Sequence, residues 1–137
     1  MSKVYGHGIT DVGTMISTGN RHPAYNFWKN MLERCYSKRL QKKYPTYMGC
    51  SVCEEWLVFS QFEKWFDEHY IVGYQVDKDI FSDVKEYSPI NCCMIPKRLN
   101  VLLAGKYKHH IRESAKLFLI EEAITQVIYD AIIIKLK

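Results

Sequence analysis

The stretch that decides the fold begins with Val76-Asp77-Lys78-Asp79-Ile80, continues with Asn91-Cys92-Cys93-Met94-Ile95-Pro96, and ends with Lys97-Arg98-Leu99-Asn100. The alternation over Tyr74–Phe81 predicts a first strand, Cys92–Ile95 a second, and Tyr87-Ser88-Pro89 between them is typical of a turn. The proline that ends the second strand is expected to open a helix that runs to about Leu103, because proline is tolerated in a first helical turn. These residues therefore predict a strand–turn–strand–helix unit.

This unit could carry chemistry, because a hairpin followed directly by a helix can aim two side chains at one cation. The candidates are Asp77 on the first strand and Asn100 on the helix. Oxygen ligands of this kind suit Mg²⁺ or Mn²⁺, and a general base on the hairpin would then activate water beside a phosphate. An Asp-x-Asp pair is equally typical of two strand carboxylates of which one lies in water, so both interpretations stay open.

Before this unit, the apolar residues of 24–38 recur at helical spacing, and His22-Pro23 is typical of a helix start. A second, aromatic helix is expected to begin near Ser60 and to end before Gly73, after a short extended piece at residues 51–53. The first 20 residues are rich in glycine and predict a loop or a short edge strand.

After this unit, the pattern predicts a strand over Lys106–Ile111 and a helix from Glu121 to about Leu136. We therefore expect an α+β fold with an N-terminal amphipathic helix and a C-terminal helical appendage. The expected domains are a core, residues 1–104, and a strand–helix appendage, residues 105–137.

Composition excludes a disordered chain, because 47% of the 137 residues are hydrophobic and 14% are aromatic. The net charge of +4 is unevenly distributed. Residues 20–43 carry seven basic residues and one acidic residue, and residues 97–116 carry six basic residues and one acidic residue. Residues 54–90 between them carry three basic and nine acidic residues. Two basic blocks around an acidic one suit a protein that holds a polyanion and keeps carboxylates for another purpose. A solvated surface of mixed charge explains the same pattern.

The chain shows neither a membrane segment nor an export signal. Its apolar run Ala131–Ile134 is far shorter than the roughly 20 residues that a bilayer requires. We therefore expect no membrane partner and a reducing cytosol, where the five cysteines are free thiols or metal ligands. A structural zinc ion could be held by four of them, whereas buried free thiols are the alternative; the four are Cys35, Cys50, Cys53 and Cys92.

Between Gly6 and about Leu103, the chain carries several short motifs in a fixed order. They are Tyr25-x-x-Trp28-x-x-Met31-Leu32-x-Arg34-Cys35-Tyr36, Tyr44-Pro45-Thr46-Tyr47-x-Gly49-Cys50-Ser51-Val52-Cys53-x-Glu55-Trp56, Phe59-x-x-Phe62-x-x-Trp65, Asp77-Lys78-Asp79-Ile80 and Tyr87-Ser88-Pro89-x-Asn91-Cys92. Together they resemble bacteriophage HNH-type homing-endonuclease-like proteins. The resemblance implies a ββα-metal hairpin-and-helix core in a phage accessory protein of the host cell cytoplasm.

The resemblance also implies roles for single residues. Asp77 matches the metal-binding aspartate, Asn91 the asparagine that holds the loop, and Asn100 the helix ligand. Active members of the family have the pair Asp-His in the first strand, and this histidine is the general base. This chain has Lys78 in place of the histidine. A lysine ordinarily has a pKa of about 10.4 and is protonated at pH 7, so it cannot accept a proton from water. We therefore expect impaired catalysis, and an active protein would be a Mg/Mn-dependent HNH-type DNA endonuclease.

The C-terminal residues resemble a shortened form of the DNA-reading domain that often follows HNH cores. Residues 105–111 match its first strand, and residues 121–129 the start of its helix. The alternative is a helix that packs on the core or on a second subunit, because the apolar positions between Ile124 and Leu136 form too broad a surface for a free helix. If the helix packs on a second subunit, the protein forms a homodimer through it.

The first functional hypothesis is a catalytically impaired, HNH-like phage protein that binds DNA. One alternative is a phage protein that acts in host takeover by binding and blocking a host defence nuclease or the transcription machinery. The altered motif and the acidic segment favour this alternative. Another is an active nicking endonuclease with a rearranged base. The DNA-binding residues expected from the basic blocks are Arg34, Lys38, Arg39, Lys42, Lys43, Lys97, Arg98, Lys106 and Lys108.

Overall fold

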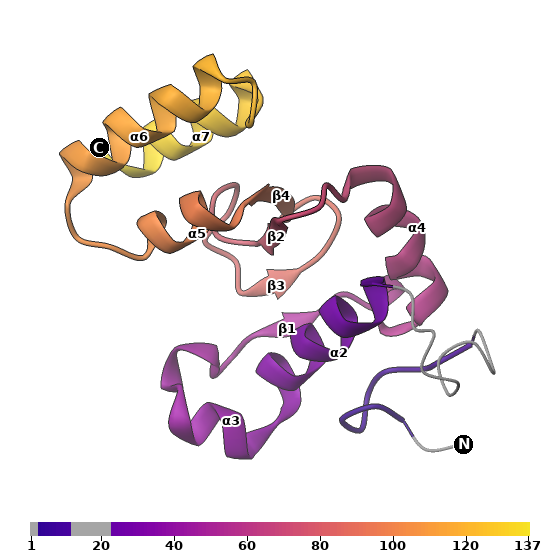
Figure 1. The fold of residues 1–137 in the computed structure, drawn as a ribbon. Helices are drawn as coiled ribbons and strands as arrows, with labels where there is room; N and C mark the ends of the chain where they lie inside the picture. The colour runs from indigo at the N-terminus through magenta and orange to yellow at the C-terminus, as the bar shows by residue number, and fades with distance from the viewer. Residues whose placement is uncertain (1–2, 12–22) are drawn as a thin grey trace. The chain divides into compact units, whose positions relative to one another are not determined.

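The computed structural model describes residues 3–11 and 23–137, and over these residues the chain has six α-helices and two two-stranded sheets (Figure 1). The expected α+β class is confirmed. The expectations for the rest of the first 20 residues and for His22 lie outside the described residues. In the described part, no helix is long and apolar enough to cross a membrane.

The chain divides into two compact units, which we call unit 1 and unit 2. Unit 1 comprises Met1–His69 and Lys85–Pro89, and unit 2 comprises Tyr70–Val84 and Ile90–Lys137. This division differs in position from the domain boundary expected between residues 104 and 105.

Unit 1 begins its helices with α2 (Pro23–Tyr36), which confirms the expected amphipathic helix. Its buried stripe includes Ala24, Trp28 and Leu32, which have no exposed surface. The expected helix continued to Lys38, but the structure breaks it at Ser37. The Ser37 hydroxyl accepts a hydrogen bond from the Leu40 N–H at 3.2 Å, so it caps a separate short helix, α3 (Lys38–Lys43).

An aromatic core holds unit 1 together. It forms between α2, the 3₁₀ helix η2 (Glu55–Leu57) and α4 (Phe59–His69). The Trp28 Nε1–H donates to the Trp56 carbonyl at 2.7 Å. The Trp56 and Phe62 rings pack edge to face, with their centroids 5.0 Å apart. These aromatic residues are fully buried, and the expected start of the second helix near Ser60 is confirmed.

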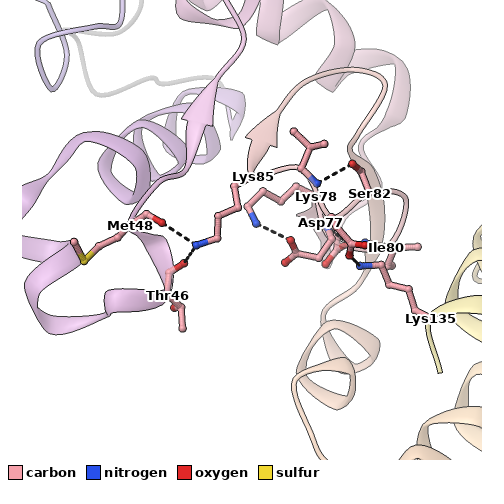
Figure 2. A network of polar contacts seen from close by, with 11 residues as sticks. Thr46, Met48, Asp77, Lys78, Ile80, Ser82, Lys85 and Lys135 are labelled. Carbon is pink, nitrogen blue, oxygen red and sulfur yellow. Dashed lines mark hydrogen bonds and ion pairs between the residues drawn. The ribbon is translucent and has the colours of Figure 1, made fainter. Parts of the chain in front are cut away.

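A parallel pairing between distant segments completes unit 1. Strand β1 (Ser51–Val52) pairs with β3 (Glu86–Tyr87), which the sequence did not predict. The neighbouring Lys85 ammonium donates to the carbonyls of Thr46 at 3.2 Å and Met48 at 2.8 Å (Figure 2). Lys85 thereby fastens the loop that contains the 3₁₀ helix η1 (Pro45–Tyr47).

Unit 2 contains the expected strand–turn–strand–helix unit. Strand β2 (Tyr74–Asp77) pairs antiparallel with β4 (Cys93–Pro96), and α5 (Lys97–Leu103) follows β4 directly. The first strand is shorter than expected: it ends at Asp77, not at Phe81. The reason is a turn in which the Asp77 carboxylate accepts hydrogen bonds from two following backbone N–H groups.

The C-terminal residues form two helices, α6 (Lys108–Ile120) and α7 (Gln126–Lys135). The strand expected over Lys106–Ile111 is therefore wrong, because Ile111, Ala115 and Phe118 follow the helical period and bury one face of α6. The helix expected from Glu121 begins later, since Glu121–Ala123 form a turn and Thr125 caps α7.

Both C-terminal helices share one hydrophobic core with the β-hairpin and α5. This arrangement bears out the packing alternative for the tail, and residues 105–137 are not a strand–helix appendage. The buried members of this core are Ile80, Cys93, Ile95, Leu99, Ile111, Ala115, Phe118, Ile124, Ile128, Ile132 and Leu136.

In unit 1, the N-terminal segment Lys3–Asp11 packs on α2 through Gly8. A Cβ atom at Gly8 would lie 2.4 Å from Leu32 Cδ1 and 2.8 Å from Trp28 Cζ2. Only a residue without a side chain allows this approach.

We expect Gly8→Ala to lower the free energy of unfolding by about 1–3 kcal/mol, because the added methyl group overpacks the core beside Trp28. Urea denaturation of the full chain measures this. Lys3→Ala is the matched control, since Lys3 is exposed in the same segment, and its effect should stay within about 0.5 kcal/mol. Equal stability of the two variants would contradict the packing of this segment on α2.

Candidate functional site

A cavity of about 440 Å³ lies within unit 2 and gathers residues that the sequence placed in different motifs. Asp77 and Asn100, the expected metal ligands, line it together with Lys106 and Lys108 from the second basic block. We call it the unit 2 cavity. Its other lining residues are Asp79, Ile80, Leu103, Ala104, Gly105, Ile111, Ile132, Lys135 and Leu136.

Asp77 organises the turn at the end of β2. Its Oδ2 atom accepts hydrogen bonds from the Asp79 N–H at 2.9 Å and the Ile80 N–H at 2.8 Å. Burial raises the pKa of the Asp77 carboxyl above its ordinary value, and the negative Asp79 adds to this effect. The two backbone hydrogen bonds and the nearby Lys78 charge act in the opposite direction. This carboxylate therefore has a structural role in addition to any ligand that it binds.

Lys78, at the place where the family's general base is expected, forms an ion pair. Its side chain is only 10% exposed, and Nζ lies 2.6 Å from Asp79 Oδ1 (Figure 2). An ammonium group held in such an ion pair has no lone pair to accept a proton. The contact thus agrees with the expectation that this residue does not act as a base.

The two asparagines of the motif differ in position. Asn100 donates from Nδ2 to Gln75 Oε1 at 2.8 Å, which ties α5 to β2 and fixes the carboxamide at the cavity. Asn91 lies in the turn before β4 and does not line the cavity.

Asp77, Asp79 and Asn100 would be the residues to hold Mg²⁺ or Mn²⁺. All three line the unit 2 cavity and offer the hard oxygen atoms that these ions prefer. A bound cation would supply an electrostatic contact for a phosphate oxygen. This donor set fits the expected cofactor, whose binding stays a prediction.

The basic residues of unit 2 fall into two groups. Lys106 and Lys108 line the cavity, as does Lys135, which belongs to neither basic block. Lys135 lies at the end of α7, and its Nζ is 2.9 Å from Asp83 Oδ1. Lys97 and Arg98 are exposed on the first turn of α5 outside the cavity.

Two of the arginines expected to bind DNA make contacts within their own units. The Arg98 guanidinium lies 5.6 Å from the centroid of the Phe118 ring in unit 2. In unit 1, Arg34 lies close enough to the Tyr87 hydroxyl to act on it electrostatically. Burial raises the pKa of the Tyr87 hydroxyl, and the Arg34 charge opposes this shift. Arg98 therefore contributes to packing within unit 2.

Short helix α3 presents the first basic block in unit 1. Lys38, Arg39, Lys42 and Lys43 are all exposed, and the Lys43 Nζ lies 5.4 Å from the centroid of the Tyr44 ring. Four exposed cations within six residues form a surface that suits a polyanion.

The cysteines do not form a recognisable zinc site over residues 3–11 and 23–137. No three His, Cys, Asp or Glu side chains gather there as metal ligands would. Cys35, Cys50 and Cys53 belong to unit 1, whereas Cys92 belongs to unit 2. Burial raises the pKa of the Cys53 thiol, which opposes the deprotonation that zinc requires. The structural zinc ion expected at these four cysteines stays a prediction.

We expect the pH dependence of stability to report on Asp77. Since the folded protein binds the Asp77 proton more tightly than the unfolded chain, wild type should lose stability relative to Asp77→Asn as pH rises from the ordinary pKa of 3.8 through the raised value. Urea denaturation of both proteins from acidic to neutral pH measures the difference.

Asp77→Ala is the companion variant, because it also removes the oxygen that accepts two backbone hydrogen bonds. It should lower the free energy of unfolding by about 1–3 kcal/mol relative to Asp77→Asn at neutral pH. If wild type instead gained stability over Asp77→Asn with rising pH, burial would not dominate at this carboxyl.

The chain was compared with family models, curated proteins and solved structures. No family model matches it, and neither a curated protein nor a solved structure matches it.

Proposed function

We propose that this protein is an HNH-like phage accessory protein that binds DNA in the host cell cytoplasm and has little or no cleavage activity. The observation that carries the proposal is the unit 2 cavity, where Asp77 and Asn100 lie with Lys106, Lys108 and Lys135. Ammonium groups attract the phosphates of the DNA backbone, and the motif residues lie at the same place.

The order of elements around the cavity supports the HNH-like part of the proposal. An antiparallel hairpin, β2 and β4, leads without a break into α5, which has the connectivity of a ββα unit. Asp77 ends the first strand, and Asn100 lies one turn into the helix.

The exposed cations of α3 in unit 1 support a second contact with DNA. Lysine and arginine contacts to phosphate position a protein on DNA but do not read its sequence. Contacts of this kind alone would make the proposed binding tolerant of sequence.

We expect Lys106→Gln/Lys108→Gln to weaken binding of a fluorescent duplex, because two phosphate-attracting charges at the cavity are removed. The slope of log K against log salt should become shallower by roughly 0.9 for each phosphate that the protein no longer neutralises. Fluorescence anisotropy across a salt series measures both the affinity and the slope.

The matched control is Lys64→Gln/Lys116→Gln, which removes the same charge from exposed positions outside the cavity. If both double variants weakened binding equally, net charge and not the cavity would account for it. If wild type did not bind DNA even at low salt, the proposal would fail. The blocking of a host protein would then be favoured, and the exposed Leu117, Ile120, Val127 and Ile134 of α6 and α7 offer an apolar surface for it.

We expect wild type to leave a supercoiled plasmid uncut with Mg²⁺ or Mn²⁺, since Lys78 is paired with Asp79 and no base is assigned. Gel electrophoresis of the plasmid after incubation measures nicking. Nicking by wild type that is abolished in Asp77→Ala would instead support the active endonuclease.

A further inference from the structure

The unit 2 cavity combines two surfaces of different chemistry. One is apolar: Ile80, Ile111 and Ile132 are buried in the core of unit 2 and also line the cavity. The other is polar and comes from the end of β2, from α5 and from the start of α6. A volume of about 440 Å³ lies in the range of roughly 300–1,000 Å³ that is typical of sites for small organic molecules.

The charges at the cavity disfavour a bare anion as its ligand. Lys106 and Lys108 have no carboxylate within ion-pair distance over the part of the chain that the structure describes, so they can attract a phosphate. Asp77 and Asp79 line the same cavity and would repel it. A ligand that satisfies both pairs carries a phosphate at one end and N–H donors at the other.

Asn100 of α5 adds a positioned carboxamide to the lining of the cavity. Its hydrogen bond to Gln75 holds it in place at the cavity. Carboxamides and carboxylates are the groups with which proteins recognise the exocyclic amino groups of bases. A flat heterocycle could lie against the isoleucine side chains while its edge meets these polar groups.

We propose that the unit 2 cavity binds a single nucleotide, with the phosphate at Lys106 and Lys108 and an amino-bearing base at Asn100 and the aspartates. The nucleotide is either free or the terminal nucleotide of a DNA strand. The second source rests on the proposed DNA binding and deepens it, whereas the first does not depend on it.

Isothermal titration calorimetry of the full chain with AMP, adenosine and inorganic phosphate tests this proposal at fixed ionic strength. AMP should bind at least about tenfold more tightly than either part alone, because one ligand satisfies both halves of the cavity. UMP, which lacks the amino group, should bind more weakly than AMP.

Two variants test the assigned ends of the nucleotide. Lys106→Gln/Lys108→Gln should abolish the advantage of AMP over adenosine, whereas Lys64→Gln/Lys116→Gln should preserve it. Asn100→Leu should abolish the preference for AMP over UMP, with circular dichroism as the check that the variant is folded. The proposal is overturned if phosphate binds as tightly as AMP, if AMP does not bind, or if both lysine pairs have equal effects.

A DNA arm separates the two sources of the nucleotide. Anisotropy compares a duplex that has a 5′-phosphorylated overhang with a closed dumbbell of the same duplex sequence. Tighter binding of the open duplex, with competition by AMP, indicates the terminal nucleotide. Equal binding without competition, together with AMP binding in calorimetry, indicates a free nucleotide. If neither DNA binds, the proposed function fails, and calorimetry still decides the nucleotide site.

Discussion

The turn held by the Asp77 carboxylate is the constraint on which unit 2 depends. By accepting the N–H groups of Asp79 and Ile80, Asp77 ends β2 and redirects the chain within three residues. The same turn buries Ile80 in the core and places Lys78 and Asp79 in an ion pair. A carboxylate expected to serve chemistry thus first shapes the backbone, and the hydrogen bonds that it accepts offset only part of the cost of its burial.

The second constraint on unit 2 is that its hairpin and α5 cannot bury enough apolar surface alone. Small sheets require a packed face to be stable, and here α6 and α7 provide it. These helices also supply Ile111, Ile132 and Lys135 to the cavity. The C-terminal residues therefore build the site as well as the core, so their removal should affect ligand binding and folding together.

In unit 1, by contrast, aromatic side chains of α2, η2 and α4 make the core, and two short strands from distant segments close it. The cations of α3 remain exposed because that helix has no buried residue. The −6 charge of residues 54–90 is divided between the two units, since Asp77, Asp79 and Asp83 belong to unit 2. A charge sum along the chain therefore does not describe the field that a polyanion meets on either unit.

The sequence by itself determined the helices at residues 23–36 and 59–69 and the strand–turn–strand–helix unit, because their period and their turn residues are local signals. It did not determine the parallel pair of β1 and β3, since this pairing follows from contacts between residues far apart in the chain. The strand expected over residues 106–111 was wrong for a different reason: the helical period of Ile111, Ala115 and Phe118 is a local signal, but it extends beyond those six residues. Asp77, Asn100, Lys106 and Lys108 could be chosen as candidates from motif and charge. Only the tertiary structure brought them to one cavity and added Lys135, because a lone lysine in an apolar helix carries no local signal of a site.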